Sequence, residues 1–188
     1  MTTSLPSYEL RPFNADTFEL TREEWLSGAD SSGASSLPYE KTLEWAAKRM
    51  KYDEPHQGDS LAYGIFPTDN GGGAVAIADI VYTARPGPDV GWLKMLEVSL
   101  SPTIDPSVQQ LQSVISMVVG VYLAAITGTL RLTGTHRSRV VKLYGRNENL
   151  LTFLTALSTQ LTSELQQLGL DGLSVRMEGR WLVIGAKN

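Results

Sequence analysis

One junction constrains the fold of this chain more than any other feature. A strand-like run from Trp92 to Leu100 ends at Ser101-Pro102, and the following stretch, residues 106–130, contains no charged side chain. A long uncharged helix is best accommodated when it is buried against a sheet. Where a strand ends and a helix begins, unpaired backbone N–H groups and the helix dipole converge. The junction therefore predicts a helix-covered sheet with an anion pocket at the helix N-terminus.

The loop at this junction has unusual chemistry for an anion pocket. Residues 101–106 include two prolines and one acid and lack glycine. Each proline removes an amide donor, and Asp105 would repel a phosphate or compete for the same N–H groups. The predicted architecture favours a cofactor site, whereas the loop chemistry opposes one.

The composition excludes several classes of site. The chain contains no cysteine, so it has no disulfide, thiolate metal site or cysteine nucleophile. The two histidines, His56 and His136, lie far apart in the sequence, so no metal site is expected. The length of 188 residues and the 42% apolar content predict a single domain over residues 1–188. No basic and apolar leader precedes it, so a cytoplasmic location is expected.

Charge is unevenly distributed along the chain. Residues 1–105 carry eight basic and sixteen acidic side chains, whereas residues 106–188 carry eight basic and four acidic ones. A basic segment between Arg131 and Arg146 would attract anions. No aromatic residue lies between Arg131 and Lys142 to stack a base, so no nucleic acid partner is expected.

Hydrophobic periodicity and turn residues give the expected elements. The segment 28–36 is expected to be a loop because it is rich in Gly, Ser and Ala. The expected elements are a strand over 8–13, helices over 15–27 and 38–51, strands over 61–66, 74–82 and 92–100, the uncharged helix 106–130, a strand over 139–144, a helix over 147–168 and strands over 173–177 and 181–184.

The uncharged stretch 106–130 is also long enough to cross a membrane. It contains several Gln, Ser and Thr residues, and no second hydrophobic segment accompanies it. A helix buried against a sheet explains it better, so no membrane is expected.

This order of elements resembles the GNAT N-acetyltransferase superfamily over nearly the whole chain. The segments that carry the resemblance are YELRPFNADTFE, WLKMLEVSLSP and VVKLYGRNENLLTFLTAL. The resemblance implies an α/β (α+β) fold with a mixed, mostly antiparallel sheet of about seven strands and four helices. It also implies that the fourth and fifth strands splay apart and hold acetyl-CoA or another acyl-CoA. A homodimer pairing through the C-terminal strands is a further expectation from the family.

The resemblance assigns roles to residues of this chain. Glu97 would act as general base on an amine, and Tyr144 would protonate the departing thiolate. The bland alternatives are a solvent-facing strand carboxylate paired with Lys94, and a half-buried strand tyrosine. The residues expected to bind the cofactor are Val98, Leu100, Thr103, Ser107, Val108, Gln109, Arg137 and Asn147, although helix capping alone would account for Asn147.

Two functions follow from these observations. The first is an N-acyltransferase that moves an acyl group from acyl-CoA to a small-molecule or peptide amine. The second is a catalytically inactive GNAT-fold binding module, such as a phage or accessory protein, with a protein or small-anion partner. The glycine-free loop motivates the second.

Overall fold

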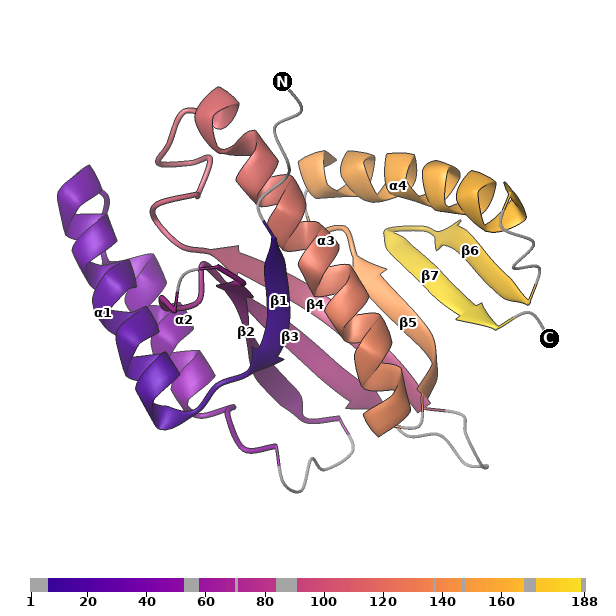
Figure 1. Ribbon diagram of the computed structural model, residues 1–188, viewed down its shortest axis with the longest axis horizontal. Coiled ribbons are helices and arrows are strands. Elements are labelled where there is room, and N and C mark those ends of the chain that lie inside the picture. Colours follow the sequence, from indigo (N-terminus) through magenta and orange to yellow (C-terminus); the bar gives the residue numbers. More distant parts are fainter. Residues whose placement is uncertain are drawn as a thin grey trace. The chain divides into compact units, whose positions relative to one another are not determined.

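The computed structural model describes residues 7–52, 58–69, 71–83, 91–136, 138–146, 148–167 and 172–186. Within them, four helices alternate with the strands of one seven-stranded sheet, whose order is β1-β2-β3-β4-β5-β7-β6 (Figure 1). The elements are β1 (Tyr8–Pro12), α1 (Ala15–Ser32), α2 (Leu37–Ala47), β2 (Ser60–Pro67), β3 (Ala76–Thr83), β4 (Gly91–Leu100), α3 (Leu111–Thr135), β5 (Ser138–Tyr144), α4 (Glu148–Gln167), β6 (Leu173–Glu178) and β7 (Trp181–Ala186).

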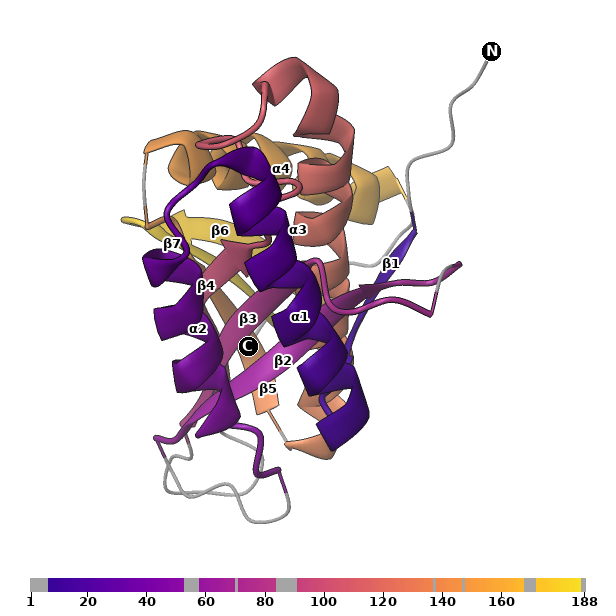
Figure 2. The same ribbon diagram turned by 90° about the vertical axis from the view of Figure 1, so that its left-hand side faces the viewer.

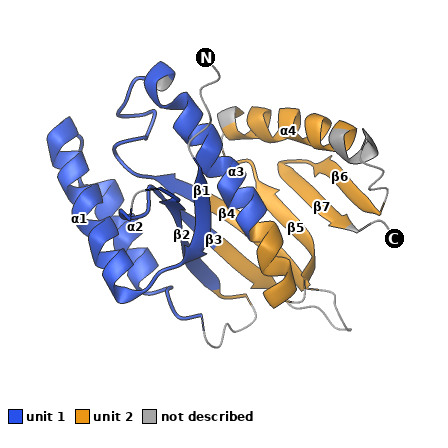
Figure 3. Cartoon of the chain, in the orientation of Figure 1, with its two compact units in different colours: residues 1–55, 60–79, 98–128 blue, residues 56–59, 80–97, 129–188 orange. Residues whose placement is uncertain are grey.

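The sheet is mixed, as predicted. Strands β4 and β5 are parallel, whereas the pairs β1/β2, β5/β7 and β6/β7 are antiparallel. The predicted fold class and order of elements are therefore confirmed. The chain divides into two compact units (Figure 3), and the expectation of a single domain stays a prediction. Unit 1 comprises residues 1–55, 60–79 and 98–128, and unit 2 comprises residues 56–59, 80–97 and 129–188.

Unit 1 is held together by an aromatic core. Helices α1 and α2 run side by side (Figure 2), and their inward residues pack on β2 and β3. Trp25 is 1% exposed, and its indole N–H donates to the carbonyl of Ala74 at 2.6 Å. The side-chain oxygen of buried Thr21 accepts a hydrogen bond from the Ala74 N–H at 2.8 Å. These two bonds satisfy both backbone groups of Ala74 where α1 packs on the segment before β3.

Helix α1 corrects one sequence prediction, because the expected loop 28–36 is wrong. The helix begins with a capping box between Asn14 and Thr17 and continues to Ser32. It ends where Gly33 adopts a φ of 68°, a left-handed conformation that glycine tolerates best. Gly28 lies inside the helix, where α1 approaches the loop after β4: a Cβ at Gly28 would lie 3.3 Å from Thr103 Cγ2, a tight contact. Composition alone could not reveal this packing.

Helix α3 begins later than predicted, because residues 101–110 form a series of turns. At Gly128 the helix passes so close to β1 that a Cβ would lie 2.4 Å from Leu10 Cβ. By length and composition, the segment Gln112–Thr135 could cross a membrane, with a mean hydropathy of 1.9, and 44% of its apolar window is buried. Core helices of soluble proteins meet the same criterion, so this is weak support for a membrane span.

Unit 2 is built on β4, β5, β7 and β6, with α4 packed on β6 and β7. Leucines at three- and four-residue spacing supply the contact face of α4, where Leu150 and Leu154 are buried. The strands alternate between buried residues on the face toward the core and half-exposed residues on the other face.

Candidate functional site

The loop after β4, residues 101–110, uses its own backbone donors. The N–H groups of Ile104 and Asp105 donate to the carbonyl of Ser101 at 3.1 and 2.9 Å. The N–H groups of Val108 and Gln109 donate to the carbonyl of Asp105 at 2.9 and 2.8 Å. Four of the amides that could face a phosphate are therefore bonded within the loop.

The Asp105 side chain accepts hydrogen bonds from further donors, in the same loop and on α2. Its Oδ1 accepts hydrogen bonds from the Ser107 N–H at 2.8 Å and from the Ser107 hydroxyl at 2.7 Å. Its Oδ2 accepts one from the hydroxyl of Tyr39, on α2, at 3.1 Å. Burial raises the pKa of Tyr39 to about 12, and the charge and hydrogen bond of Asp105 add to the shift. The predicted competition of Asp105 for an N–H group of the loop is confirmed.

A cavity of about 810 Å³ lies between α1 and this loop, within unit 1. Three residues predicted for cofactor binding, Thr103, Val108 and Gln109, contribute to its wall. The Thr103 hydroxyl is hydrogen-bonded to that of Ser101 at 2.8 Å, and the Gln109 side-chain amide donates to the carbonyl of Pro102 at 3.1 Å. The α1 side of the cavity contributes Leu20, Glu23, Glu24, Ser27, Gly28, Ser31 and Ser32. The residues named here as lining the cavity carry carboxylate and hydroxyl groups, and none of them is basic. Such a cavity does not suit a phosphate, because the carboxylates would repel its negative charge.

In unit 2, β4 pairs with β5 over its first part only, whereas β5 is paired with β4 over all but its last residue. Their register runs from Gly91 opposite Ser138 to Met95 opposite Leu143 and then stops. Glu97 and Tyr144 lie beyond the last pair. The predicted splaying of the two strands stays a prediction. The Glu97 carboxylate forms an ion pair with Arg146. The Tyr144 ring packs against that of Trp181, with centroids 4.8 Å apart.

The other predicted cofactor residues have varied surroundings. Val98 is buried on β4, and Leu100 is half-buried at the end of the strand. Ser107 is exposed but bonded to Asp105. Arg137 and Asn147 lie outside the described residues. The predicted roles of all the named catalytic and cofactor residues stay predictions.

Two contacts of the residues singled out in the sequence were not predicted: that of Asp105 with Tyr39 and that of Glu97 with Arg146. Tyr39 bonds Asp105 across 66 positions of sequence, and Arg146 neutralises Glu97. No local pattern indicates either contact, because each joins separate elements. The described residues contain no group of three or more His, Asp or Glu side chains that would hold a metal ion.

Comparisons with known proteins concern the fold. No protein-family model matches the chain, and no curated protein matches it. The fold is similar to that of a possible acetyltransferase from Clostridium difficile 630, which is 14% identical, with 82% of this chain and 90% of that chain covered and a TM-score of 0.44.

Two further solved structures are similar to a comparable degree. A GNAT family acetyltransferase from Brucella melitensis in complex with acetyl-CoA is 11% identical, with 96% of this chain and 89% of that chain covered and a TM-score of 0.42. AtaTR bound with AcCoA is 11% identical, with 94% and 92% covered and a TM-score of 0.47. These similarities are likenesses of fold alone.

Proposed function

We propose that the chain is a GNAT-like binding module that does not hold the pyrophosphate of acyl-CoA with loop 101–110. The observation that carries this proposal is the Asp105 carboxylate, bonded to the amide and hydroxyl of Ser107 and to the hydroxyl of Tyr39. A phosphate at this loop would need the same N–H group and would meet a negative charge. The module is therefore expected to act through binding rather than acyl transfer.

The other amides of the loop support the same proposal. Pyrophosphate binding at a helix N-terminus requires several N–H groups that point outward together. Here the N–H groups of Ile104, Asp105, Val108 and Gln109 point to carbonyls of the loop itself. Opening them would cost several backbone hydrogen bonds before any ligand bond formed.

Acyl transfer is the second candidate, and one observation favours it. Strands β4 and β5 stop pairing after Met95, which leaves Glu97 and Tyr144 beyond the paired region. Glu97 would then serve as general base for an amine, and Tyr144 as general acid for the CoA thiolate. The ion pair with Arg146 weighs against this role, because a base must exchange that partner for the amine.

Titration calorimetry with acetyl-CoA tests the proposal. We expect no binding to the wild type and measurable binding to Asp105→Gly, because that change frees the Ser107 donors and removes the charge. Asp69→Gly is the matched control, since it removes the same charge from an exposed position in unit 1 and should not create binding. Wild-type binding in the micromolar range would overturn the proposal.

If the wild type does bind acetyl-CoA, thiol release in the presence of a mixture of amines tests the second candidate. Acyl transfer forms an amide and releases free CoA thiol, which a colorimetric reagent detects. Glu97→Gln should then lower the rate and leave the affinity for acetyl-CoA unchanged. An unchanged rate would remove Glu97 from the mechanism.

A further inference from the structure

One face of the sheet in unit 2 carries a row of cations across four adjacent strands. Residues opposite one another in register share a face of a sheet. Lys94 on β4 lies opposite Lys142 on β5, which lies opposite Val183 on β7, which lies opposite Arg176 on β6. Three of these four positions are therefore basic and lie in one line; Arg176 is exposed, the Lys142 side chain is 15% exposed, and Val183 between them is buried.

Aromatic rings lie on both sides of this row. Trp92 is two residues before Lys94, so it shares the face, and Lys142 Nζ lies 4.2 Å from the centroid of its ring. On the other side, Tyr144 lies two residues after Lys142 and pairs with Trp181. The rings of Trp92, Tyr144 and Trp181 are all half-buried, so part of each reaches solvent. Successive rows lie about 7 Å apart along the strands.

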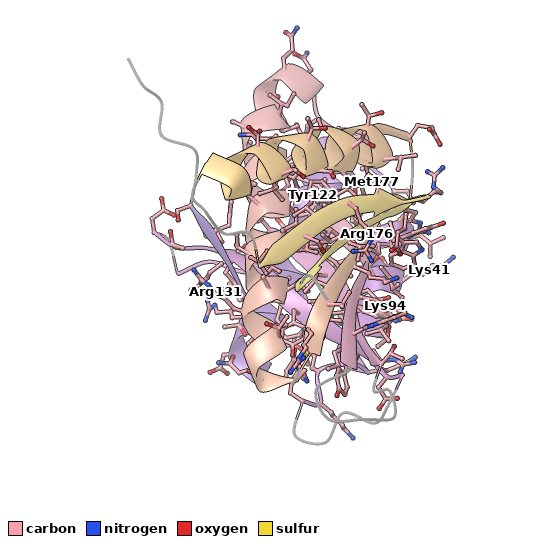
Figure 4. The ribbon with its side chains drawn as sticks, turned by 90° about the vertical axis from the view of Figure 1, so that its right-hand side faces the viewer. Lys41, Lys94, Tyr122, Arg131, Arg176 and Met177 are labelled. Carbon is pink, nitrogen blue, oxygen red and sulfur yellow. The ribbon has the colours of Figure 1, made fainter. Side chains whose placement is uncertain are left out.

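The opposite face of these strands is the one that faces the core. Figure 4 shows Met177 pointing toward α4, whereas Lys94 and Arg176 project to the other side. The residues between those of the cationic face are buried, among them Leu93, Val141, Leu143, Leu182 and Ile184. The half-buried aromatic residues therefore lie outside the core of unit 2, where Lys142 covers part of Trp92 and the rings of Tyr144 and Trp181 pack on each other.

The face carries an excess of positive charge. Glu178 contacts both Lys142, at 3.1 Å, and Arg176, at 2.8 Å, so one carboxylate serves two cations. Among the described residues, no acidic group lies within ion-pair distance of Lys94. The sequence of unit 2 holds ten basic and seven acidic residues, whereas that of unit 1 holds six and thirteen.

We propose that this face binds single-stranded nucleic acid. The parts of the half-buried rings that reach solvent can stack bases, and cations between them can neutralise the phosphates that connect those bases. The sequence-based expectation of no nucleic acid rested on the absence of aromatic residues between Arg131 and Lys142. The structure brings the rings to Lys142 from β4 and β7 instead. The proposed nucleic acid site does not include loop 101–110. Binding of acetyl-CoA by the wild type would therefore contradict the proposed function without contradicting this site.

Fluorescence anisotropy of a labelled oligouridine of about ten nucleotides tests the proposal. We expect binding that weakens between about 50 and 200 mM salt, with a logarithmic slope of about −2 for three cations. Trp92→Ala should lower the affinity about 5- to 150-fold through loss of base stacking. Thermal unfolding of this variant will show that it remains folded.

A lysine variant and an arginine variant test the proposal without removing a half-buried ring, so a loss of binding cannot be mistaken for a loss of folding. Lys94→Ala should flatten the salt slope by about 0.7, because one phosphate contact is lost. Arg131→Ala is the matched control: it removes the same charge from an exposed position on α3, which lies on the other side of the ribbon from Lys94 (Figure 4). It should change neither the affinity nor the slope.

Three results would overturn the proposal. The first is no change in anisotropy at the highest soluble protein concentration. The second is an equal loss of affinity in Lys94→Ala and Arg131→Ala, which would show general electrostatic attraction. The third is displacement of the oligouridine by polyglutamate as effectively as by unlabelled oligouridine, which would indicate an acidic protein partner instead.

Discussion

Trp25 of unit 1 contrasts with the two tryptophans of unit 2, although Trp45 of unit 1 is half-buried at the edge of its core. In unit 1, Trp25 is 1% exposed, donates its N–H to Ala74, and meets the Tyr39 ring edge-on with centroids 6.1 Å apart. In unit 2, Trp92 and Trp181 stay half-exposed on a sheet face, next to cations and a tyrosine. The difference shows that unit 1 closes its core with buried aromatic residues such as Trp25, whereas unit 2 fills its core with aliphatic residues and leaves Trp92 and Trp181 half-buried on a sheet face.

Polar contacts follow the same division. In unit 1 the bond between Tyr39 and Asp105 involves a tyrosine that is 7% exposed. In unit 2 the side chains of Glu97 and Arg146 are 43% and 58% exposed. Water therefore competes weakly for the first contact and strongly for the second. Solvent-exposed polar groups such as Glu97 and Arg146 are the ones that a binding partner can contact, because the partner can replace the water around them.

The largest expected effect comes from exchanging tryptophans for alanine in the two units. Trp25→Ala should lower the free energy of unfolding by about 3–5 kcal/mol, because it leaves a cavity in the core and an unpaired carbonyl. Trp92→Ala should cost about 1 kcal/mol, because its ring is already partly hydrated. Urea denaturation measures both values. Similar losses in the two variants would contradict the distinction between a closed core and a surface cluster.

An intermediate effect is expected for Tyr39→Phe, which should cost about 1 kcal/mol at neutral pH through the lost hydrogen bond to Asp105. The folded-state pKa of Tyr39, about 12, lies above the ordinary value of 10.0, mainly because of burial. Its contribution to stability is therefore complete below pH 10 and is lost as the pH rises through 12.

Urea denaturation between pH 9 and pH 12 checks the Tyr39 prediction. The wild type should lose stability over the upper part of this range, and Tyr39→Phe should lose less. Part of the loss should remain in the variant, because burial also raises the pKa of Tyr52 to about 12. Identical alkaline profiles for the wild type and Tyr39→Phe would show that the buried phenol does not differ from an exposed one.

The sequence predicted the elements better than their contacts. Alternation and leucine spacing were sufficient for β4 and α4, because the burial of each element depends on its own periodicity. The extension of α1 through Gly28 was not predicted, because the Gly, Ser and Ala content of residues 28–36 is typical of a loop, whereas the packing of α1 on the loop after β4 joins distant segments. The obstruction at Asp105 was predicted from its charge and position alone. The ion pair of Glu97 with Arg146 was not, because it requires the end of β4 to meet the segment after β5.

That ion pair gives the smallest expected effect and tests the exposed side of the comparison. Glu97→Gln, Arg146→Gln and the double variant form a thermodynamic cycle, and the coupling between the two side chains should be about 0.2–1 kcal/mol. The coupling should decrease as salt is added, because both groups are in contact with solvent. A coupling well above this range that resists salt would mean that the end of β4 is as closed as the core of unit 1. Glu97 would then be a structural residue, which would weigh further against acyl transfer through it.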